Sequence, residues 1–368
     1  MKQVFSCSTV LAAGLLMTVG AGAAQAGPEG VALQNRTIGY VMIAENRAIY
    51  ETHDAKAECP NGFNDGPREN FKTLYPDESK RTVEGTLLVR EADIWWPTTK
   101  PESLAFHEIK GNTGLGLNLD GKTGPNDFTS PDGAVKGIDN QLYRAIGCIR
   151  NYREEGETSI LTPQWRSRYI YNAFVIELTD VDNLANDDDV TVTTYRGLDK
   201  LISDATGNSY LPGGTQTADM RWGKAFIQKF KGKIKDGTLT TEAKDLLIPS
   251  ASIYQPRDGA PDIFWHDLRF ELALGQDSAQ GYMGGYVDID SWYTHSNKTR
   301  DTAHQAYGNT SSGSMYKAMK RLADAYPDKD GHNTAISGAM NVRFTQVFVK
   351  HPEAQVAGVP AAGRDAHE

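Results

Sequence analysis

The sequence predicts a mainly β protein made of antiparallel β-sandwich modules with two short amphipathic helices. Short segments with strand periodicity recur along the chain, only two segments have helical periodicity, and the 36 Gly and 16 Pro residues suit a loop-rich fold. We divide the chain into a β-rich module over 27–165, which carries an Asp/Asn-rich loop, and a β-sandwich-like module over 166–350. Residues 351–368 are a small-residue tail that we expect to be disordered.

The first module is expected to contain three extended segments and one helix. The strands are predicted over Thr37–Tyr50, Thr82–Trp96 and Leu104–Leu119, where apolar residues dominate or alternate with Gly and Asn. A helix is predicted to begin at Asp139, because an Asp cap precedes Leu142, Ile146 and Ile149 at helical spacing.

The second module is expected to be built from hairpins and one helix. Lys224–Ile234 and Gly237–Thr240 are predicted to pair through Asp236-Gly237, a strong hairpin signal because Gly adopts positive φ without cost. A helix is predicted over Ser311–Tyr326, with its apolar residues on one stripe. The other strands are predicted over Phe174–Leu178, Val190–Tyr195, Ile263–Leu274, Gly281–Trp292 and Val342–Val349.

The first 26 residues have the organisation of a secretory signal peptide. Lys2 precedes an apolar run over Val10–Val19, and Ala24-Gln25-Ala26 has the small-x-small pattern of a cleavage site. The alternative, a membrane anchor, fits less well because the apolar run is short for a bilayer. We therefore expect cleavage after Ala26, a periplasmic or secreted location, and no transmembrane segment after cleavage.

Charge and cysteine content narrow the class of protein further. The formal net charge of −9 makes nucleic acid an unfavourable partner, because an acidic surface repels phosphate backbones. After cleavage only Cys59 and Cys148 remain, and two cysteines in an oxidising compartment most often pair. We predict a disulfide between them; the alternative is two separate thiols.

The Asp/Asn-rich loop is the predicted metal site. Short carboxylates and amides on a Gly-rich loop can converge on Ca²⁺, which takes six to eight oxygen ligands. The alternative is a set of Asx-turns and a helix cap without an ion. A second Asp-rich turn, over Asp180–Asp189, fits solvated charges better than calcium. The candidate ligands are Asn118, Asp120, Asp127, Asp132 and Asp139.

The same loop carries a resemblance to other proteins. Gly116–Gly121, Asp127–Gly133 and Gly137–Gln141 form a GxNLDG…DFTSPDG…GIDNQ pattern. This pattern resembles a family of uncharacterised exported bacterial proteins, many of which have Asp where this chain has Asn118. The resemblance implies export and brings no known activity.

An aromatic and histidine-rich segment is the second candidate site. If Gly281–Trp292 is one strand, then Tyr286, Asp288, Asp290 and Trp292 share a face. Aromatic rings beside carboxylates are typical of saccharide sites, and a carboxylate pair can also perform acid/base hydrolysis. The alternative is a polar outer face. The ligand-binding candidates are Tyr286, Trp292 and Tyr293, and the catalytic candidates are Asp288, Asp290, His295 and His304.

These observations leave three functional hypotheses. The first is an exported, calcium-stabilised binding or accessory protein that binds a saccharide or another envelope component. The second is a secreted hydrolase acting on a polysaccharide or an ester, with its site near residues 288–304. The third is a purely structural envelope component. The sequence lacks a Gly-x-Ser-x-Gly elbow, a His-Glu-x-x-His motif and a Walker loop, which favours the first and third hypotheses.

Overall fold

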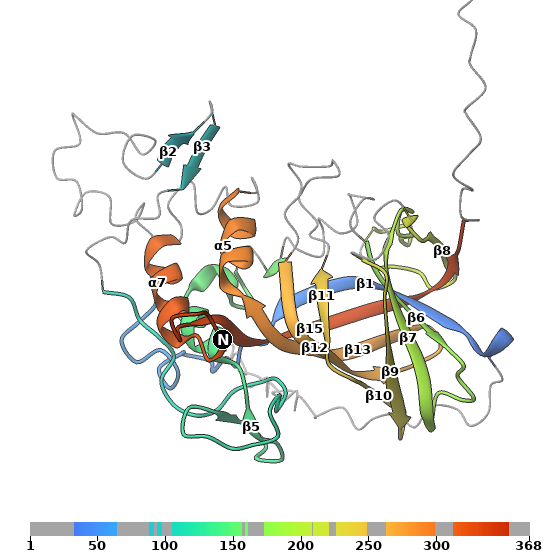
Figure 1. Cartoon of the computed structure of the whole chain (residues 1–368), viewed down its shortest axis with the longest axis horizontal. Helices are drawn as coiled ribbons and strands as arrows, with labels where there is room; N and C mark the ends of the chain where they lie inside the picture. The colour runs from blue at the N-terminus through green and yellow to red at the C-terminus, as the bar shows by residue number, and fades with distance from the viewer. Residues whose placement is uncertain are drawn as a thin grey trace, which may run out of the picture.

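The main feature of the molecule is a closed barrel of eight antiparallel strands (Figure 1). The computed structural model describes residues 33–64, 88–91, 94–97, 105–156, 159–160, 173–207, 209–220, 226–248, 263–298 and 312–352. Each barrel strand pairs with the barrel strand that precedes it in the sequence, and the last barrel strand pairs with the first. The barrel strands are β1 (Ile38–Arg47), β6 (Ala173–Thr179), β7 (Asp187–Gly197), β9 (Gln228–Lys235), β10 (Thr238–Thr241), β12 (Ile263–Leu274), β13 (Ser278–Asp288) and β15 (Asn333–Lys350).

The prediction of a mainly β protein is confirmed, but the β-sandwich is wrong. Strand β1 pairs with β6 on one edge and with β15 on the other, so that one sheet closes on itself instead of two sheets packing face to face. Alternating apolar residues predict that one face of a strand is buried; they do not determine whether the sheet closes. Because β1 precedes residue 165 and the other barrel strands follow it, the barrel draws on both predicted modules.

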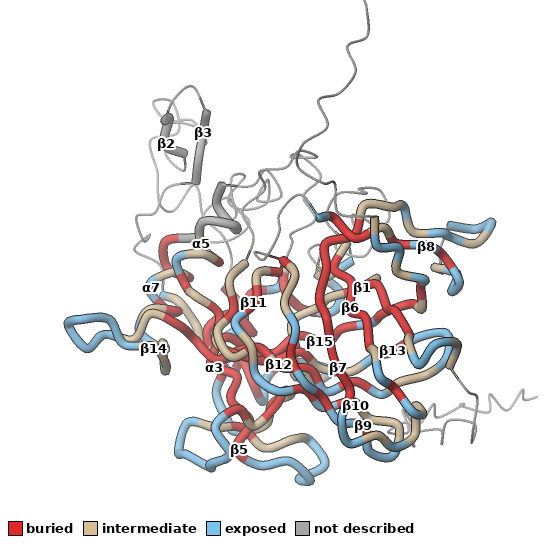
Figure 2. The backbone as a smooth tube through the Cα atoms, turned by 45° about the vertical axis from the view of Figure 1, so that its right-hand side comes forward, coloured by how far each residue is buried: buried red, intermediate tan, exposed pale blue. Residues whose placement is uncertain are grey.

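The barrel interior is a packed hydrophobic core. Inward side chains from opposite walls meet there, and the rings of Phe174 and Phe270 stack with their centroids 6.0 Å apart. Figure 2 shows that buried positions follow the barrel strands and α3. We therefore look for functional groups on the outer face and at the ends of the barrel. Core residues include Tyr40, Met42, Phe174, Ile176, Phe230, Phe270, Leu272, Met283 and Phe344.

Short strands and helices surround the barrel. The helices α3, α5 and α7 gather at one end of the barrel, and β8 lies at the opposite end (Figure 1). Within the described part of the chain, none of the helices combines the length and apolar character needed to cross a bilayer. The short strands are β2 (Leu88–Glu91), β3 (Ile94–Pro97), β4 (Phe128–Thr129), β5 (Lys136–Ile138), β8 (Gly214–Thr217), β11 (Lys244–Ile248) and β14 (Ala325–Pro327). The helices are η1 (Gln34–Arg36), α3 (Gln141–Ile146), η3 (Arg150–Tyr152), α5 (Ile289–Lys298) and α7 (Ser312–Leu322).

Several element predictions hold and others need correction. The hairpin turn at Asp236-Gly237 is confirmed, with φ of 49° and 77°. Residues 105–119 do not form the predicted strand; they are irregular, and Gly116 and Leu117 pack against Ala339 of β15 and Gly284 of β13. The predicted strand over Gly281–Trp292 ends at Asp288, and α5 begins directly after it. The predicted signal peptide and residues 353–368 lie outside the described residues.

Candidate functional site

The predicted catalytic carboxylates are engaged in structural contacts at α5. The Asp288 carboxylate accepts a hydrogen bond of 2.6 Å from Ser291 N and so caps the helix. Asp290 lies in the first turn of the helix, not on the face of a strand, which corrects the predicted shared face. Its carboxylate accepts a hydrogen bond from the Tyr316 hydroxyl and pairs with Lys320 Nζ at 3.0 Å, which ties α5 to α7.

The remaining residues of this predicted site do not converge on one point. Trp292 is buried, with its ring centroid 6.3 Å from that of Tyr152. Tyr293 packs on Tyr316 between α5 and α7, with the ring centroids 4.3 Å apart. His295 lies in α5, and His304 is outside the described residues. Of the predicted ligand-binding residues, only Tyr286 lies on the outer face of the barrel, where side chains are partly exposed.

Four rings form a cluster on this outer face, which we call the aromatic shelf: Phe264, His266, Tyr286 and Tyr326. The His266 ring stacks on Tyr326 with the centroids 3.9 Å apart, and Phe264 meets His266 edge-on at 4.6 Å. Tyr286 is the cross-strand partner of His266 and packs edge-on against Tyr326 at 5.8 Å. All four side chains are partly exposed. The shelf therefore offers aromatic surface to a ligand.

Two carboxylates flank the shelf. The Tyr326 hydroxyl donates a hydrogen bond of 2.5 Å to Asp267, and Asp245 Oδ2 lies 3.7 Å from His266 Nδ1. Burial and the hydrogen bond to Asp267 raise the pKa of Tyr326. The register of β12 against β13 shifts between His266 and Arg269, and Asp267 has φ of 49°. This irregularity places Asp267 where regular alternation would not, so sequence reasoning missed the cluster.

Most of the predicted calcium ligands hold the turns of their own loop. Asn118 donates to Lys122 O and Lys136 O at 2.8 and 3.1 Å and accepts from Gly121 N. The Asp120 carboxylate accepts from Lys122 N at 2.8 Å. Asp127 accepts from the backbone N of Gly124, and Asp132 accepts from Ser130 Oγ and Ala134 N. These contacts are Asx-turns and short loop closures.

Asp139 differs from the other four because it is buried. Its carboxylate accepts 2.6 Å and 3.4 Å hydrogen bonds from Leu119 N and Asp120 N. Burial, with repulsion from Asp120 and Asp127, raises the pKa of Asp139 to about 6. The helix cap predicted at Asp139 is instead Asn140, whose side chain accepts a hydrogen bond from Tyr143 N.

The loop and the aromatic shelf lie close enough to interact electrostatically. Burial is the main cause that raises the pKa of Tyr286, and the charges of Asp139, Asp324 and Asp120 add to it. Asp324 in turn accepts hydrogen bonds from Ser337, which is the cross-strand partner of Tyr286. Two regions that were separate in the sequence prediction therefore adjoin on one face.

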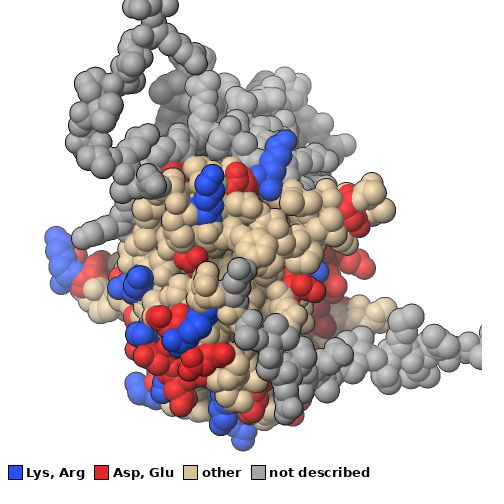
Figure 3. Space-filling view, turned by 90° about the vertical axis from the view of Figure 1, so that its right-hand side faces the viewer, with Lys and Arg blue, Asp and Glu red and all other residues tan. Residues whose placement is uncertain are grey.

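The described residues contain no group of three or more His, Cys, Asp or Glu side chains with the geometry to hold a metal ion. Calcium therefore stays a prediction. At the second Asp-rich turn, Asp182 pairs with Arg36 at 2.7 Å and Asp189 pairs with Lys231 at 2.8 Å. Figure 3 shows basic side chains interleaved with acidic ones on the face of the barrel that it presents.

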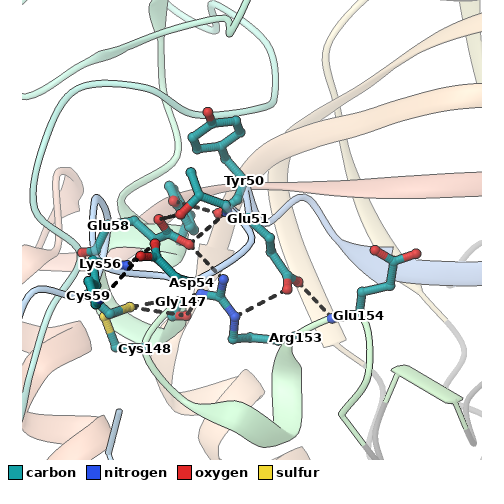
Figure 4. Close-up of polar contacts among 12 residues, drawn as sticks. Tyr50, Glu51, Asp54, Lys56, Glu58, Cys59, Gly147, Cys148, Arg153 and Glu154 are labelled. Carbon is teal, nitrogen blue, oxygen red and sulfur yellow. Dashed lines mark hydrogen bonds and ion pairs between the residues drawn. A yellow bond between two sulfur atoms is a disulfide. The ribbon is translucent and has the colours of Figure 1, made fainter. Parts of the chain in front are cut away.

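The predicted disulfide between Cys59 and Cys148 is confirmed, with a Cα–Cα distance of 5.8 Å. Beside it lies a buried ionic network (Figure 4), in which Arg153 pairs with Glu58 at 2.7 Å and with Glu51 at 3.2 Å. Arg153 also donates to Gly147 O at 2.9 Å, and Thr52 donates to Glu58 through both its backbone N and its hydroxyl. The network fastens the loop after β1 to the helical end of the barrel.

Comparisons of the chain with protein-family models, with curated proteins and with solved structures find no match. The fold defines the class, an eight-stranded antiparallel barrel with a packed interior, and function has to be inferred from the geometry of its surface.

Proposed function

We propose that the protein is an exported binding or accessory protein that binds a saccharide or a saccharide-containing envelope component at the aromatic shelf. The observation that carries the proposal is the outward cluster of His266, Tyr286 and Tyr326 with Asp245 and Asp267 at its margin. Aromatic rings suit the apolar faces of pyranose rings, and carboxylates accept hydrogen bonds from sugar hydroxyls. The disulfide is consistent with export, since disulfides persist mainly in oxidising compartments.

Binding is favoured over hydrolysis by the state of the predicted catalytic groups. Asp288 is engaged as a helix cap, and Asp290 is held by Tyr316 and Lys320. Burial tends to raise the pKa of Asp290, but those two partners outweigh it and lower the pKa below its ordinary range. A general acid near neutral pH needs the opposite shift, because it must retain its proton.

Calcium enters the proposal as a stabiliser of the loop beside the shelf. Asp120 and Asp127 both repel the charge on Asp139. A divalent cation would relieve this repulsion. If calcium binds there, chelation should lower the melting temperature of wild-type protein and should have no effect on an Asp120→Asn/Asp139→Asn variant.

The shelf is tested by glycan binding. Purified oxidised protein is screened on immobilised bacterial and plant polysaccharides, and the Kd for a bound glycan is measured for wild type, His266→Ala and Tyr286→Ala. Each substitution should weaken binding by about fivefold to thirtyfold, since a lost aromatic contact with its hydrogen bonds costs on the order of 1–2 kcal/mol.

Tyr282→Ala is the matched control. Tyr282 is a partly exposed tyrosine four residues before Tyr286 on the same strand, about 13 Å along the strand from Tyr286. It should leave the Kd unchanged. Equal losses for Tyr282→Ala and Tyr286→Ala, or no binding to any glycan tested, would count against the shelf as a saccharide site.

A further inference from the structure

Arg47, the last residue of β1, is a partly buried cation that forms no ion pair within 4 Å with any of the described residues. Its guanidinium carbon lies 4.2 Å from the centre of the Tyr152 ring and 5.8 Å from that of Trp292. Its Nε is shielded from solvent and has no hydrogen-bond partner. Burial lowers the pKa of Arg47, and electrostatic interactions with Tyr152 and Glu45 raise it in part.

Arg144, another arginine on an aromatic ring, has its donors occupied. Arg144 lies 4.3 Å over Phe128 and donates to the carbonyls of Ile109, Gly111 and Asn126 and to the side chain of Gln141. Stacking on a ring uses the face of the guanidinium plane and leaves its edge for hydrogen bonds. At Arg144 protein oxygens occupy that edge. At Arg47 the Nε part of the edge is left without a partner, although desolvating an unpaired charge is costly.

A second unpartnered donor lies on the same side of the barrel wall. Trp265 is buried, and its Nε1 has no hydrogen-bond partner. Its ring reaches Gly338, since a Cβ at Gly338 would lie 3.5 Å from Trp265 Cη2. Gly338 stands two residues before Met340, the cross-strand partner of Arg47. Gly338 and Met340 point to the same face of β15, so the Trp265 ring and Arg47 lie on the same side of the sheet, opposite the aromatic shelf.

We propose that Arg47, which packs on Tyr152 and lies beside Trp292, binds the carboxylate group of a small organic anion at this end of the barrel. A planar carboxylate matches the edge of a guanidinium, where it can accept two parallel hydrogen bonds. It also supplies a counter-charge in direct contact with the guanidinium, which Arg47 does not receive from an ion pair with any of the described residues. This site is separate from the aromatic shelf, so the two proposals stand or fall independently.

The experiment follows the Arg Nε–H and Trp Nε1–H signals by NMR while the oxidised full chain is titrated with sodium acetate, sodium glucuronate or sodium phosphate. Sodium chloride at equal ionic strength is the reference. Acetate and glucuronate should shift the Arg47 Nε–H signal in a saturable way and should raise the melting temperature. Arg47→Lys keeps the charge but loses the planar fork, and it should weaken carboxylate binding about tenfold or more.

Arg144→Lys is the matched control and should retain the wild-type response to carboxylate. The proposal is overturned if carboxylates leave the Arg47 Nε–H signal in place, if Arg47→Lys responds as wild type does, or if phosphate binds more tightly than both carboxylates. Should Arg47→Lys fail to fold, the wild-type titration with its chloride reference decides between these outcomes.

Discussion

Arg153→Met tests the ionic network beside the disulfide. The side chains of Arg153 and Glu58 are 8% and 3% exposed, and their charged groups are 2.7 Å apart. Methionine fills a similar volume but leaves the Glu58 carboxylate buried without its cation. Breaking one partner of a buried pair costs about 3–5 kcal/mol, and we expect the free energy of unfolding from urea titrations to fall by that amount.

The matched control for this variant is Arg150→Met. Arg150 and Arg153 both lie over the Phe63 ring, with guanidinium carbons 4.0 and 5.1 Å from its centre, but the Arg150 side chain is on the surface. The control should change the free energy of unfolding by about 0.5 kcal/mol or less. The ion pair with Glu58 is not what stabilises this region if the free energy of unfolding falls equally in both variants. The same conclusion holds if it falls by less than about 1 kcal/mol in Arg153→Met.

The same network predicts a pH dependence. Burial tends to raise the pKa of Glu58, but its hydrogen bonds from Thr52 and Arg153 outweigh burial and lower the pKa below the ordinary value. A depressed pKa in the folded state means that the contribution to stability is complete above the ordinary value, near pH 4.5, and is lost as the pH falls below it. In Arg153→Met, the acid limb of the stability–pH curve should be shallower than in wild type.

Three further predictions concern the disulfide, Asp139 and the cap of α3. Cys59→Ser/Cys148→Ser opens a loop with a sequence separation of 89 residues. It should lower the free energy of unfolding by roughly 4–5 kcal/mol in the chain-entropy model. Urea unfolding curves that coincide with those of the oxidised wild type would contradict this. The pKa of Asp139 is raised from 3.8 to about 6, so the folded state holds the proton more tightly than the unfolded state does. The free energy of unfolding should therefore fall as the pH rises from 3.8 to about 6. Asp139→Asn should flatten the stability–pH curve over that interval. Asn140→Ala removes the cap of α3 together with the hydrogen bonds to Ala48 O and Leu115 O. It should lower the free energy of unfolding, measured by thermal unfolding, by about 2 kcal/mol or more. The control Asp132→Ala, in an exposed loop, should lower it by less than about 1 kcal/mol.

The positions of the strands were largely predictable, and the closure of the barrel was not. Period-2 alternation predicted both ends of β12 (Ile263–Leu274), although the irregularity at Asp267 interrupts the alternation within the strand. Asp-Gly predicted the β9–β10 hairpin. Closure depends on β1 meeting β15 across almost the whole chain, through pairs such as Gly39 with Val347. No local pattern encodes that pairing, because the same alternation serves a sandwich or a barrel.

The start of α5 shows how a local pattern can be ambiguous. Tyr286, Asp288, Asp290 and Trp292 stand at intervals of two, which fits a strand. Asp288 also stands three residues before Ser291 and caps a helix there. The same alternation therefore continued past the true end of the strand. The aromatic shelf was not predictable from a local pattern either. Tyr326 contacts His266 and Tyr286 only because β14 pairs with β15.

The chemistry of this chain follows from how its polar groups are used. The sequence predicts its Asp residues near Gly-rich bends as calcium ligands. In the structure Asp120, Asp127 and Asp132 instead accept hydrogen bonds from backbone N–H groups. A short carboxylate in a turn is satisfied locally and at low cost, so its abundance says little about a ligand. The more informative groups are donors that the fold buries and leaves without partners, because each one costs stability. Arg47 Nε and Trp265 Nε1 are of this kind, and neither stood out in the sequence, because a lone arginine and a lone tryptophan form no motif.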